Sequence, residues 1–230
     1  MTLRLSNSGA SLILALSLIG ATPVALAEET ALPTPSAIGR ISYGGPAPKA
    51  DAPICTGTLV AADLVLTADH CVRGAVNSAD SVYFSAGLQD GIPVAIGRGQ
   101  EIILADPKVA KPGLAMDVAL LRLSAPLEGV MALPPARGAS TAKAYTLIAY
   151  ARSAPDVQTR NDDCFALGKD ADVIGLSCAV VSGNSGAPVL MRDGAEMHVV
   201  AVVVAAAKGL PAALTVRIPS VLVTQIDPQN

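Results

Sequence analysis

Three short segments, far apart in the chain, together carry a nucleophile, a base and an acid. They contain His70 in a T-A-D-H-C run, Asp117 at the start of a D-V-A-L-L run, and Ser185 within G-N-S-G-A-P. A serine hydroxyl becomes a good nucleophile when a base takes its proton, and an imidazole base works best when a carboxylate fixes its tautomer. The segments therefore predict acyl transfer through an activated serine.

Each of these residues also has a structural interpretation. A lone histidine in an apolar strand is usually a structural residue whose ring nitrogens have hydrogen-bond partners. We assign that role to His198, the other histidine of the chain, and not to His70. Asp117 could cap a strand, but the apolar run after it indicates a buried carboxylate, which needs a partner such as His70. Ser185 could belong to a flexible turn, but Pro188 and an apolar run follow it three residues later. We therefore favour the functional interpretation for the three residues.

The first 27 residues have the layout of a secretory signal peptide. Arg4 provides a positive charge, residues 11–19 are apolar, and Ala-Leu-Ala at 25–27 is a small-x-small cleavage site before Glu28. The alternative is an uncleaved membrane anchor, but the run is short and is interrupted by a glycine and a proline. We expect a soluble mature protein that is secreted or periplasmic.

The composition of the whole sequence suits a globular domain with an aliphatic core. The sequence is 51% hydrophobic, contains no Trp and only two Phe, and has a net charge of −3. With no block of Lys or Arg, nothing indicates a nucleic acid or an anionic membrane as a partner. Neither histidine has a second ligand at metal-binding spacing, so we expect no metal and no cofactor.

The four cysteines of an exported chain predict two disulfides. Three pairings are possible. The pairing that closes short local loops is Cys55 with Cys71 and Cys164 with Cys178.

Short β-prone runs separated by turn signals predict an all-β protein. Two clusters of about six strands flank a Pro-rich connector at residues 124–142, which suggests two six-stranded antiparallel β-barrels with a cleft between them. A short terminal helix is expected at 220–226. The expected strands are residues 57–60, 64–67, 81–85, 92–96, 101–104, 118–123, 144–149, 188–191, 198–204 and 213–218.

These motifs resemble the trypsin/chymotrypsin-like serine peptidases. That family has T-A-A-H-C, D-I-A-L-L and G-D-S-G-G-P where this chain has its three segments, and the resemblance extends from about residue 41 to 226. The compact size and the G-N-S-G form are similar to the bacterial secreted, glutamyl-endopeptidase-like branch. The resemblance implies that Ser185 attacks the scissile carbonyl, His70 moves the proton, and Asp117 orients the imidazole. It also implies an oxyanion hole made by the N–H groups of Gly183 and Ser185, and a Cys55–Cys71 bridge around the histidine loop.

Some positions depart from the family pattern. Asn184 replaces an aspartate that, in trypsins, pairs with a newly cut N-terminus, so we interpret the activation-like Gly39-Arg40-Ile41 as a coincidence. Ala187 replaces a glycine. Asp69 replaces an alanine and is expected to point away from the cleft, toward solvent or an arginine. If Asp69 reaches the imidazole, it would raise the pKa of His70.

Substrate preference is only partly indicated. Ala179 stands six residues before Ser185, where trypsins have the acid that binds Lys or Arg, so a basic residue before the scissile bond is not expected. His198, Lys208 and Arg217 are conceivable partners for an acidic side chain, or simply surface residues.

The expected organisation is a signal peptide at 1–27, an extension at 28–40, and two β-barrels at 41–130 and 131–230. We interpret the protein as a monomeric serine endopeptidase that acts on protein or peptide substrates. The main alternative is a catalytically inactive binding module of the cell envelope on the same fold. A structural β protein of the envelope is a weaker one, since it has no need of a buried Asp and a Gly-flanked Ser.

Overall fold

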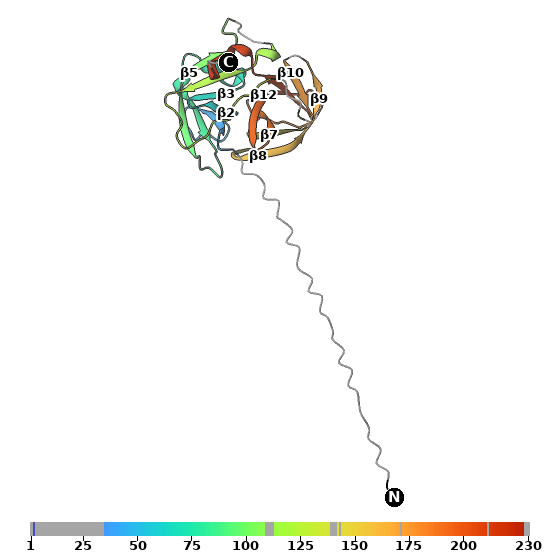
Figure 1. Ribbon diagram of the computed structural model, residues 1–230. Coiled ribbons are helices and arrows are strands. Elements are labelled where there is room, and N and C mark those ends of the chain that lie inside the picture. The colour runs from blue at the N-terminus through green and yellow to red at the C-terminus, as the bar shows by residue number, and fades with distance from the viewer. Residues whose placement is uncertain are drawn as a thin grey trace. The chain divides into compact units, whose positions relative to one another are not determined.

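The strands of this protein form two sheets that lie side by side (Figure 1). The computed structural model describes Thr2 and residues 35–108, 113–138, 142, 144–170, 172–210 and 212–227. The expected signal peptide and most of the expected extension therefore lie outside the described residues. In the described part of the chain, no helix combines the length and the apolar character that crossing a bilayer requires.

The first sheet closes into a six-stranded barrel, as the sequence predicted. Closure leaves no unpaired strand edge, and the interior is filled by aliphatic side chains and Phe84. The first strand starts at Ile38, slightly before the expected domain start at residue 41. In barrel order the strands are β1 (Ile38–Tyr43), β2 (Cys55–Ala61), β3 (Leu64–Thr67), β6 (Ala119–Leu123), β5 (Ala95–Leu104) and β4 (Val82–Ala86).

One long strand, β5, replaces two shorter strands that the sequence suggested. Gly97 and Gly99 interrupt the apolar pattern of β5, but at both positions the side chains of neighbouring residues occupy the space that a Cβ would need. A Cβ on Gly97 would lie 2.6 Å from the Leu123 side chain, and one on Gly99 would lie 2.9 Å from Leu121. The strand therefore continues through both glycines because leucines of β6 pack over them.

The second sheet has seven strands, one more than expected, and curls into a half-barrel, so the all-β, two-barrel arrangement predicted from the sequence is confirmed. The sequence did not predict β8, β9 or β10. Most of β8 and β9 is exposed, and both are at the ends of the strand order, so they lack the apolar alternation that marks a core strand. In sheet order the strands are β8 (Ala154–Cys164), β7 (Tyr145–Ala151), β11 (Pro188–Asp193), β12 (Glu196–Ala206), β13 (Ala213–Arg217), β10 (Val173–Leu176) and β9 (Ala166–Lys169).

The two sheets share a continuous core. One buried cluster fills the first barrel and continues onto residues of β7, β11, β12 and β13, whereas a second cluster lies within the second sheet. Tyr150 of β7 is fully buried and donates a hydrogen bond from its hydroxyl to the Leu88 carbonyl, at 2.8 Å. Gln158 of β8 donates to the Ile38 carbonyl at 2.7 Å. These contacts fix the sheets relative to each other.

The helical elements are short and stand at strand ends. The predicted C-terminal helix is present as α2 (Ser220–Ile226). The others are α1 (Asp69–Val72) and the 3-10 turns Arg73–Ala75, Ala79–Ser81 and Leu114–Met116.

Both disulfides have the local pairing, Cys55–Cys71 and Cys164–Cys178, which confirms that prediction. The first closes a loop of 16 residues and the second a loop of 14. Closing a loop of this length stabilises the fold by about 3 kcal/mol in the chain-entropy model.

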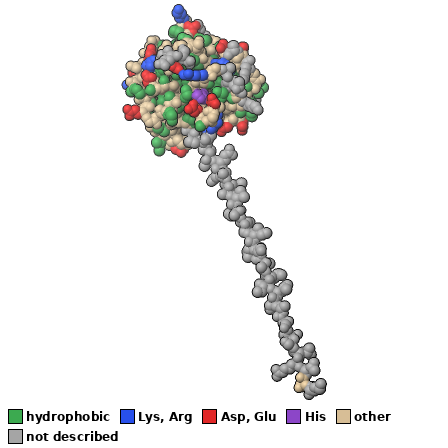
Figure 2. All heavy atoms as spheres, in the orientation of Figure 1, with side chains coloured by type: hydrophobic (Ala, Val, Ile, Leu, Met, Phe, Trp, Pro, Cys, Tyr) green, Lys and Arg blue, Asp and Glu red, His purple; other side chains and the backbone are tan. Residues whose placement is uncertain are grey.

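On the face shown in Figure 2, basic and acidic side chains are interspersed rather than gathered by sign.

Candidate active site

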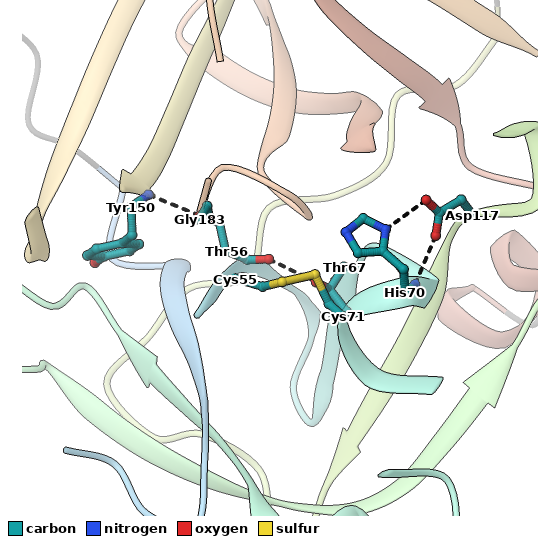
Figure 3. Close-up of a disulfide and its surroundings, with 8 residues drawn as sticks. All are labelled: Cys55, Thr56, Thr67, His70, Cys71, Asp117, Tyr150 and Gly183. Carbon is teal, nitrogen blue, oxygen red and sulfur yellow. Dashed lines mark hydrogen bonds and ion pairs between the residues drawn. A yellow bond between two sulfur atoms is a disulfide. The ribbon is translucent and has the colours of Figure 1, made fainter. Parts of the chain in front are cut away.

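His70 and Asp117 meet because the strands that carry them are neighbours. Thr67, which ends β3, pairs with Ala119, which starts β6. His70 lies in α1 just after β3, and Asp117 lies just before β6. The His70 Nδ1 atom is 2.8 Å from Asp117 Oδ2, and the His70 backbone N–H donates to Asp117 Oδ1 at 2.9 Å (Figure 3). Both carboxylate oxygens therefore hold the same histidine.

This pairing defines the tautomer and the basicity of His70. A carboxylate oxygen can only accept a hydrogen bond, so Nδ1 carries the proton and Nε2 of the neutral ring is the basic nitrogen. The hydrogen bond with Asp117 is the largest cause of a pKa for His70 above its ordinary value. Burial opposes this shift, while the charges of Asp117 and Asp69 add to it. The ring can therefore take up a proton more readily than a free imidazole.

Asp69 is bound by an arginine, as expected. Its side chain is fully buried, and Arg73 Nε donates to its two oxygens at 2.8 and 2.9 Å. The Arg73 Nη2 group also bonds Asp69, and reaches the Asp106 carbonyl at 3.2 Å. Because Asp106 lies between β5 and Asp117, the Asp69–Arg73 pair joins α1 to the segment that leads to Asp117.

Ser185 lies in a loop that the other sheet supplies and that β2 holds in place. The Thr56 N–H donates to the Ser185 carbonyl at 2.8 Å, and the Thr56 hydroxyl donates to the Gly183 carbonyl at 2.9 Å. The Tyr150 N–H in turn donates to that hydroxyl at 3.0 Å. Figure 3 shows Thr56 between Gly183 and the Cys55–Cys71 bridge. Thr56 thus joins β2, which pairs with the strand that leads to His70, to the loop of Ser185.

Thr56 was not predicted from the sequence. It is a fully buried polar residue in an apolar strand, directly after Cys55. Buried hydroxyls usually have a hydrogen-bond partner, but Thr58 of the same strand is buried and its hydroxyl has none among the described residues, so the sequence signal does not single out Thr56. The sequence could not indicate that the partner lies more than a hundred residues away.

Gly183 and Gly186 have backbone conformations that other residues avoid. Their φ angles are +102° and +84°. A Cβ on Gly183 would lie 2.6 Å from the Arg152 nitrogen, and a Cβ on Gly186 would overlap the Thr56 carbonyl and the Thr67 hydroxyl. The glycines on both sides of Ser185 are therefore required by the backbone and by close packing.

The amide of Asn184 orders the Ser185 loop from within. Asn184 is 5% exposed, and its Oδ1 accepts the Val181 N–H at 2.8 Å while its Nδ2 donates to the Tyr150 carbonyl at 2.9 Å. Gly39, Arg40 and Ile41 lie inside β1, where Arg40 is 4% exposed. A peptidase could not reach the Arg40–Ile41 bond without unfolding β1, which fits the interpretation of that motif as a coincidence.

The N–H groups of Gly183 and Ser185 are available as donors. The Ser182 carbonyl accepts the Arg152 N–H at 2.8 Å. Because the C=O and N–H of one trans peptide point in opposite directions, the Gly183 N–H points away from Arg152. Neither N–H donates to an acceptor among the residues that the structure describes. This geometry leaves two backbone donors at the loop of Ser185.

A cavity of about 510 Å³ brings the two halves of the site together. It is lined by His70 and the Cys55–Cys71 bridge from the first barrel, and by Gly183 and Ser185 from the second sheet. A larger cavity of about 640 Å³ shares only Ile54 with it and contains neither His70 nor Ser185. We place the site in the smaller cavity because that cavity contains the residues able to do chemistry.

The other candidate residues lie elsewhere. His198 Nε2 is 3.5 Å from a carboxylate oxygen of Glu196 near the β11–β12 turn. Arg217 lines a separate cavity of about 120 Å³. Cys55, His70 and Cys71 have potential ligand atoms within 4.8 Å of one another, but the two sulfurs are bonded to each other and are not thiolates. That cluster therefore offers a metal only one ordinary ligand, the imidazole.

Comparisons with known proteins agree with this architecture. A family model described as a trypsin-like peptidase domain matches residues 55–202. A thermostable serine protease, AL20, from an extremophilic microorganism has a TM-score of 0.65 and 16% identity, covering 85% of this chain and 98% of its own. A Glu endopeptidase has a TM-score of 0.64 and 18% identity, with 83% and 88% covered. The protease Anisep from Arthrobacter nicotinovorans has a TM-score of 0.61 and 14% identity, with 80% and 90% covered. At these identities the three structures show the fold alone.

Proposed function

The chain belongs to the trypsin-like peptidase family, and we propose that it is an exported serine endopeptidase in which His70, Asp117 and Ser185 act together. The observation that carries the proposal is the 510 Å³ cavity, which is lined both by His70, whose imidazole Asp117 orients, and by Ser185. The chemistry is cleavage of peptide bonds through an acyl-enzyme, and it uses no cofactor.

In this mechanism Ser185 Oγ attacks the scissile carbonyl while His70 Nε2 accepts its proton. His70 then donates that proton to the leaving amine, and Asp117 stabilises the imidazolium through the bond to Nδ1. The N–H groups of Gly183 and Ser185 stabilise the negative oxygen of the tetrahedral intermediate. One such donor is worth about 3 kcal/mol in the transition state. Water then hydrolyses the acyl-enzyme by the same proton transfers in reverse.

Several features support an active enzyme over an inactive binding module. The Ser182 carbonyl accepts the Arg152 N–H, so this carbonyl does not block the N–H groups of Gly183 and Ser185. The two departures from the family pattern beside Ser185 are accommodated, since the Asn184 side chain is hydrogen-bonded through both its oxygen and its nitrogen and Ala187 is fully buried in the core.

A fluorophosphonate probe tests the proposal, because it labels only an activated serine. We expect labelling of the wild-type protein, hydrolysis of an unstructured protein substrate, and loss of both in Ser185→Ala. A folded wild-type protein that is neither labelled nor active would favour the binding module.

The proposal also includes export and processing. Residues 1–27 are the signal peptide, residues 28–40 are an N-terminal extension whose last three residues begin β1, and the barrels at 41–130 and 131–230 form a monomeric enzyme. Two disulfides suit an extracytoplasmic location. N-terminal sequencing of the protein from its native host should begin at Glu28, and size-exclusion chromatography with light scattering should give the mass of one chain. A retained N-terminus would contradict the cleavage.

A further inference from the structure

A second, smaller cavity adjoins Ser185. It measures about 190 Å³ and is lined by the residues before Ser185 and by the end of β12. The lining residues are Val180, Val181, Ser182, Ser185, Val203, Ala205 and Ala206. Ser182 and Ser185 also line the 510 Å³ cavity, so the two cavities share the nucleophile.

The position of His70 decides which part of a substrate enters each cavity. On the proposed function, His70 must donate a proton to the leaving amine, so the leaving segment lies on the His70 side. His70 lines the 510 Å³ cavity and does not line the smaller one. The smaller cavity therefore lies next to the acyl part of the substrate, whose side chain is the one nearest the scissile carbonyl.

The chemistry of the smaller cavity is aliphatic. The residues described as lining it carry no charge, and their polar side-chain groups are the hydroxyls of Ser182 and Ser185. Val203 is buried at 1% exposure, whereas Val181 is 58% exposed at the rim. A charged side chain placed here would lose water without gaining an opposite charge, which is costly.

The cations that could have received an acidic side chain are not in this cavity. Arg217 lines a different cavity, and His198 faces Glu196. Lys208 is exposed and does not belong to the lining. The solved structure named a Glu endopeptidase shares the fold with this chain, but at 18% identity it carries no information about side-chain preference.

We propose that this chain cleaves after a small or medium-sized aliphatic residue, whose side chain occupies the cavity formed by Val181, Val203 and Ala206. The inference rests on the proposed function. An apolar cavity of about 150 Å³ holds one benzene molecule, so about 190 Å³ accommodates a side chain of Val, Leu or Met size. Discrimination comes from the cost of removing water from a charged or amide group.

Matched peptide substrates test the proposal, with Met, Glu or Lys before the scissile bond in an otherwise constant sequence. The three side chains have similar length and differ in charge. We expect kcat/KM for Met to exceed that for Glu and for Lys by about 100-fold or more. Leu against its near-isostere Asn gives a second comparison without charge, with Leu preferred. Equal or higher kcat/KM for Glu or Lys overturns the proposal.

An added charge tests the location. Ala206→Lys introduces a cation into the lining, and the ratio of kcat/KM for Glu to that for Met should rise several-fold. Ala207→Lys, one residue outside the lining, should leave the wild-type ratio unchanged. If both variants keep the wild-type ratio of kcat/KM for Glu to that for Met, or if this ratio rises equally in both, the substrate side chain does not occupy this cavity.

Fluorophosphonate labelling separates this inference from the proposed function. A protein that is labelled and cleaves peptides without the aliphatic preference refutes the inference and leaves the function intact. A folded protein that is not labelled refutes the function, and the inference with it.

Discussion

The two halves of the candidate site are held in position by different forces. On the first-barrel side, charged side chains do the positioning: Asp117 holds His70, and the buried Asp69–Arg73 pair joins the helix to the segment before Asp117. On the second-sheet side, Ser185 is placed mainly by backbone hydrogen bonds. The base is therefore held by electrostatics, and the nucleophile by main-chain geometry.

This difference follows from what each half must do. A base changes its charge during the reaction, so nearby carboxylates tune its pKa as well as its position. A nucleophile and its two N–H donors need fixed directions, which hydrogen-bonded loops with glycines provide. The two halves should consequently respond to different substitutions, and Thr56 is the hydrogen-bonded residue that joins them.

The largest expected effect comes from breaking the backbone geometry. Gly186→Ala adds a Cβ that overlaps the Thr56 carbonyl and the Thr67 hydroxyl, at a φ of +84°. Overpacking and the strained backbone together should cost about 2–5 kcal/mol and displace Ser185. We expect loss of fluorophosphonate labelling and a lowered midpoint in urea unfolding.

Gly194→Ala is the matched control, because Gly194 has a φ of +61° but no atom within 4 Å of its Cβ position. Its cost should be about 1–2 kcal/mol, with labelling retained. Equal effects of the two substitutions would mean that backbone conformation alone matters and that close packing around Ser185 does not.

Breaking the charged half should lower stability by a comparable amount. Arg73→Met leaves Asp69 fully buried without its cation, which typically costs about 3–5 kcal/mol. Asp69→Asn keeps an oxygen that can accept from Arg73 and should cost less. Urea unfolding at pH 7 measures both. A variant Arg73→Met that is as stable as wild type would show that the pair has no positioning role.

A smaller effect is expected from restoring the trypsin-like acid at position 184. Asn184→Asp removes the Nδ2 donor to the Tyr150 carbonyl and buries a carboxylate without a new partner. The loss should be about 1–3 kcal/mol, with kcat reduced more than KM is raised, because the Ser185 loop loses order. Asn161→Asp, at an exposed site, is the control and should stay within about 0.5 kcal/mol of wild type. Full activity in Asn184→Asp would show that the amide is not required.

Sequence patterns predicted most of the strands that have an apolar face, but they missed β1, whose residues are largely buried, and β10, whose residues alternate between buried and half-buried. The strands β2, β3, β6, β11, β12 and β13 were recognised because their residues are largely buried, and the local disulfide pairing was correct. The polar edge strand β8 was not recognised, and β5 was divided at Gly97 and Gly99 because leucines from another strand supply its side-chain contacts.

The same distinction applies to the site. The motifs indicated His70, Asp117 and Ser185 as candidates, and the structure brings His70 and Asp117 into contact and lines one cavity with His70 and Ser185. The role of Thr56 and the hydrogen-bond partners of Asn184 could not be predicted, because they depend on contacts between separate sheets. Local sequence carries residue chemistry, whereas long-range hydrogen bonds appear only after folding.

The smallest expected effect is a shift in pH dependence, and it tests how far the charged half tunes the base. Catalysis needs neutral His70, so kcat/KM should fall as the pH drops through the pKa of this imidazole. The hydrogen bond to Asp117 is the largest cause that raises this pKa, so the acid limb should lie above the ordinary value of about 6.5. Asp69→Asn removes one of the negative charges that raise the pKa, so its limb should move to lower pH.

Arg73→Met should move the limb in the opposite direction, because the buried carboxylate of Asp69 then acts on His70 without its cation. Asp193→Asn, at the exposed end of β11, serves as the control and should leave the profile unchanged. The measurement is kcat/KM against pH at a temperature where all variants are folded. Coincident acid limbs in Asp69→Asn, Arg73→Met and wild type would show that Asp117 alone determines the basicity of His70, and that the Asp69–Arg73 pair acts only as a structural link.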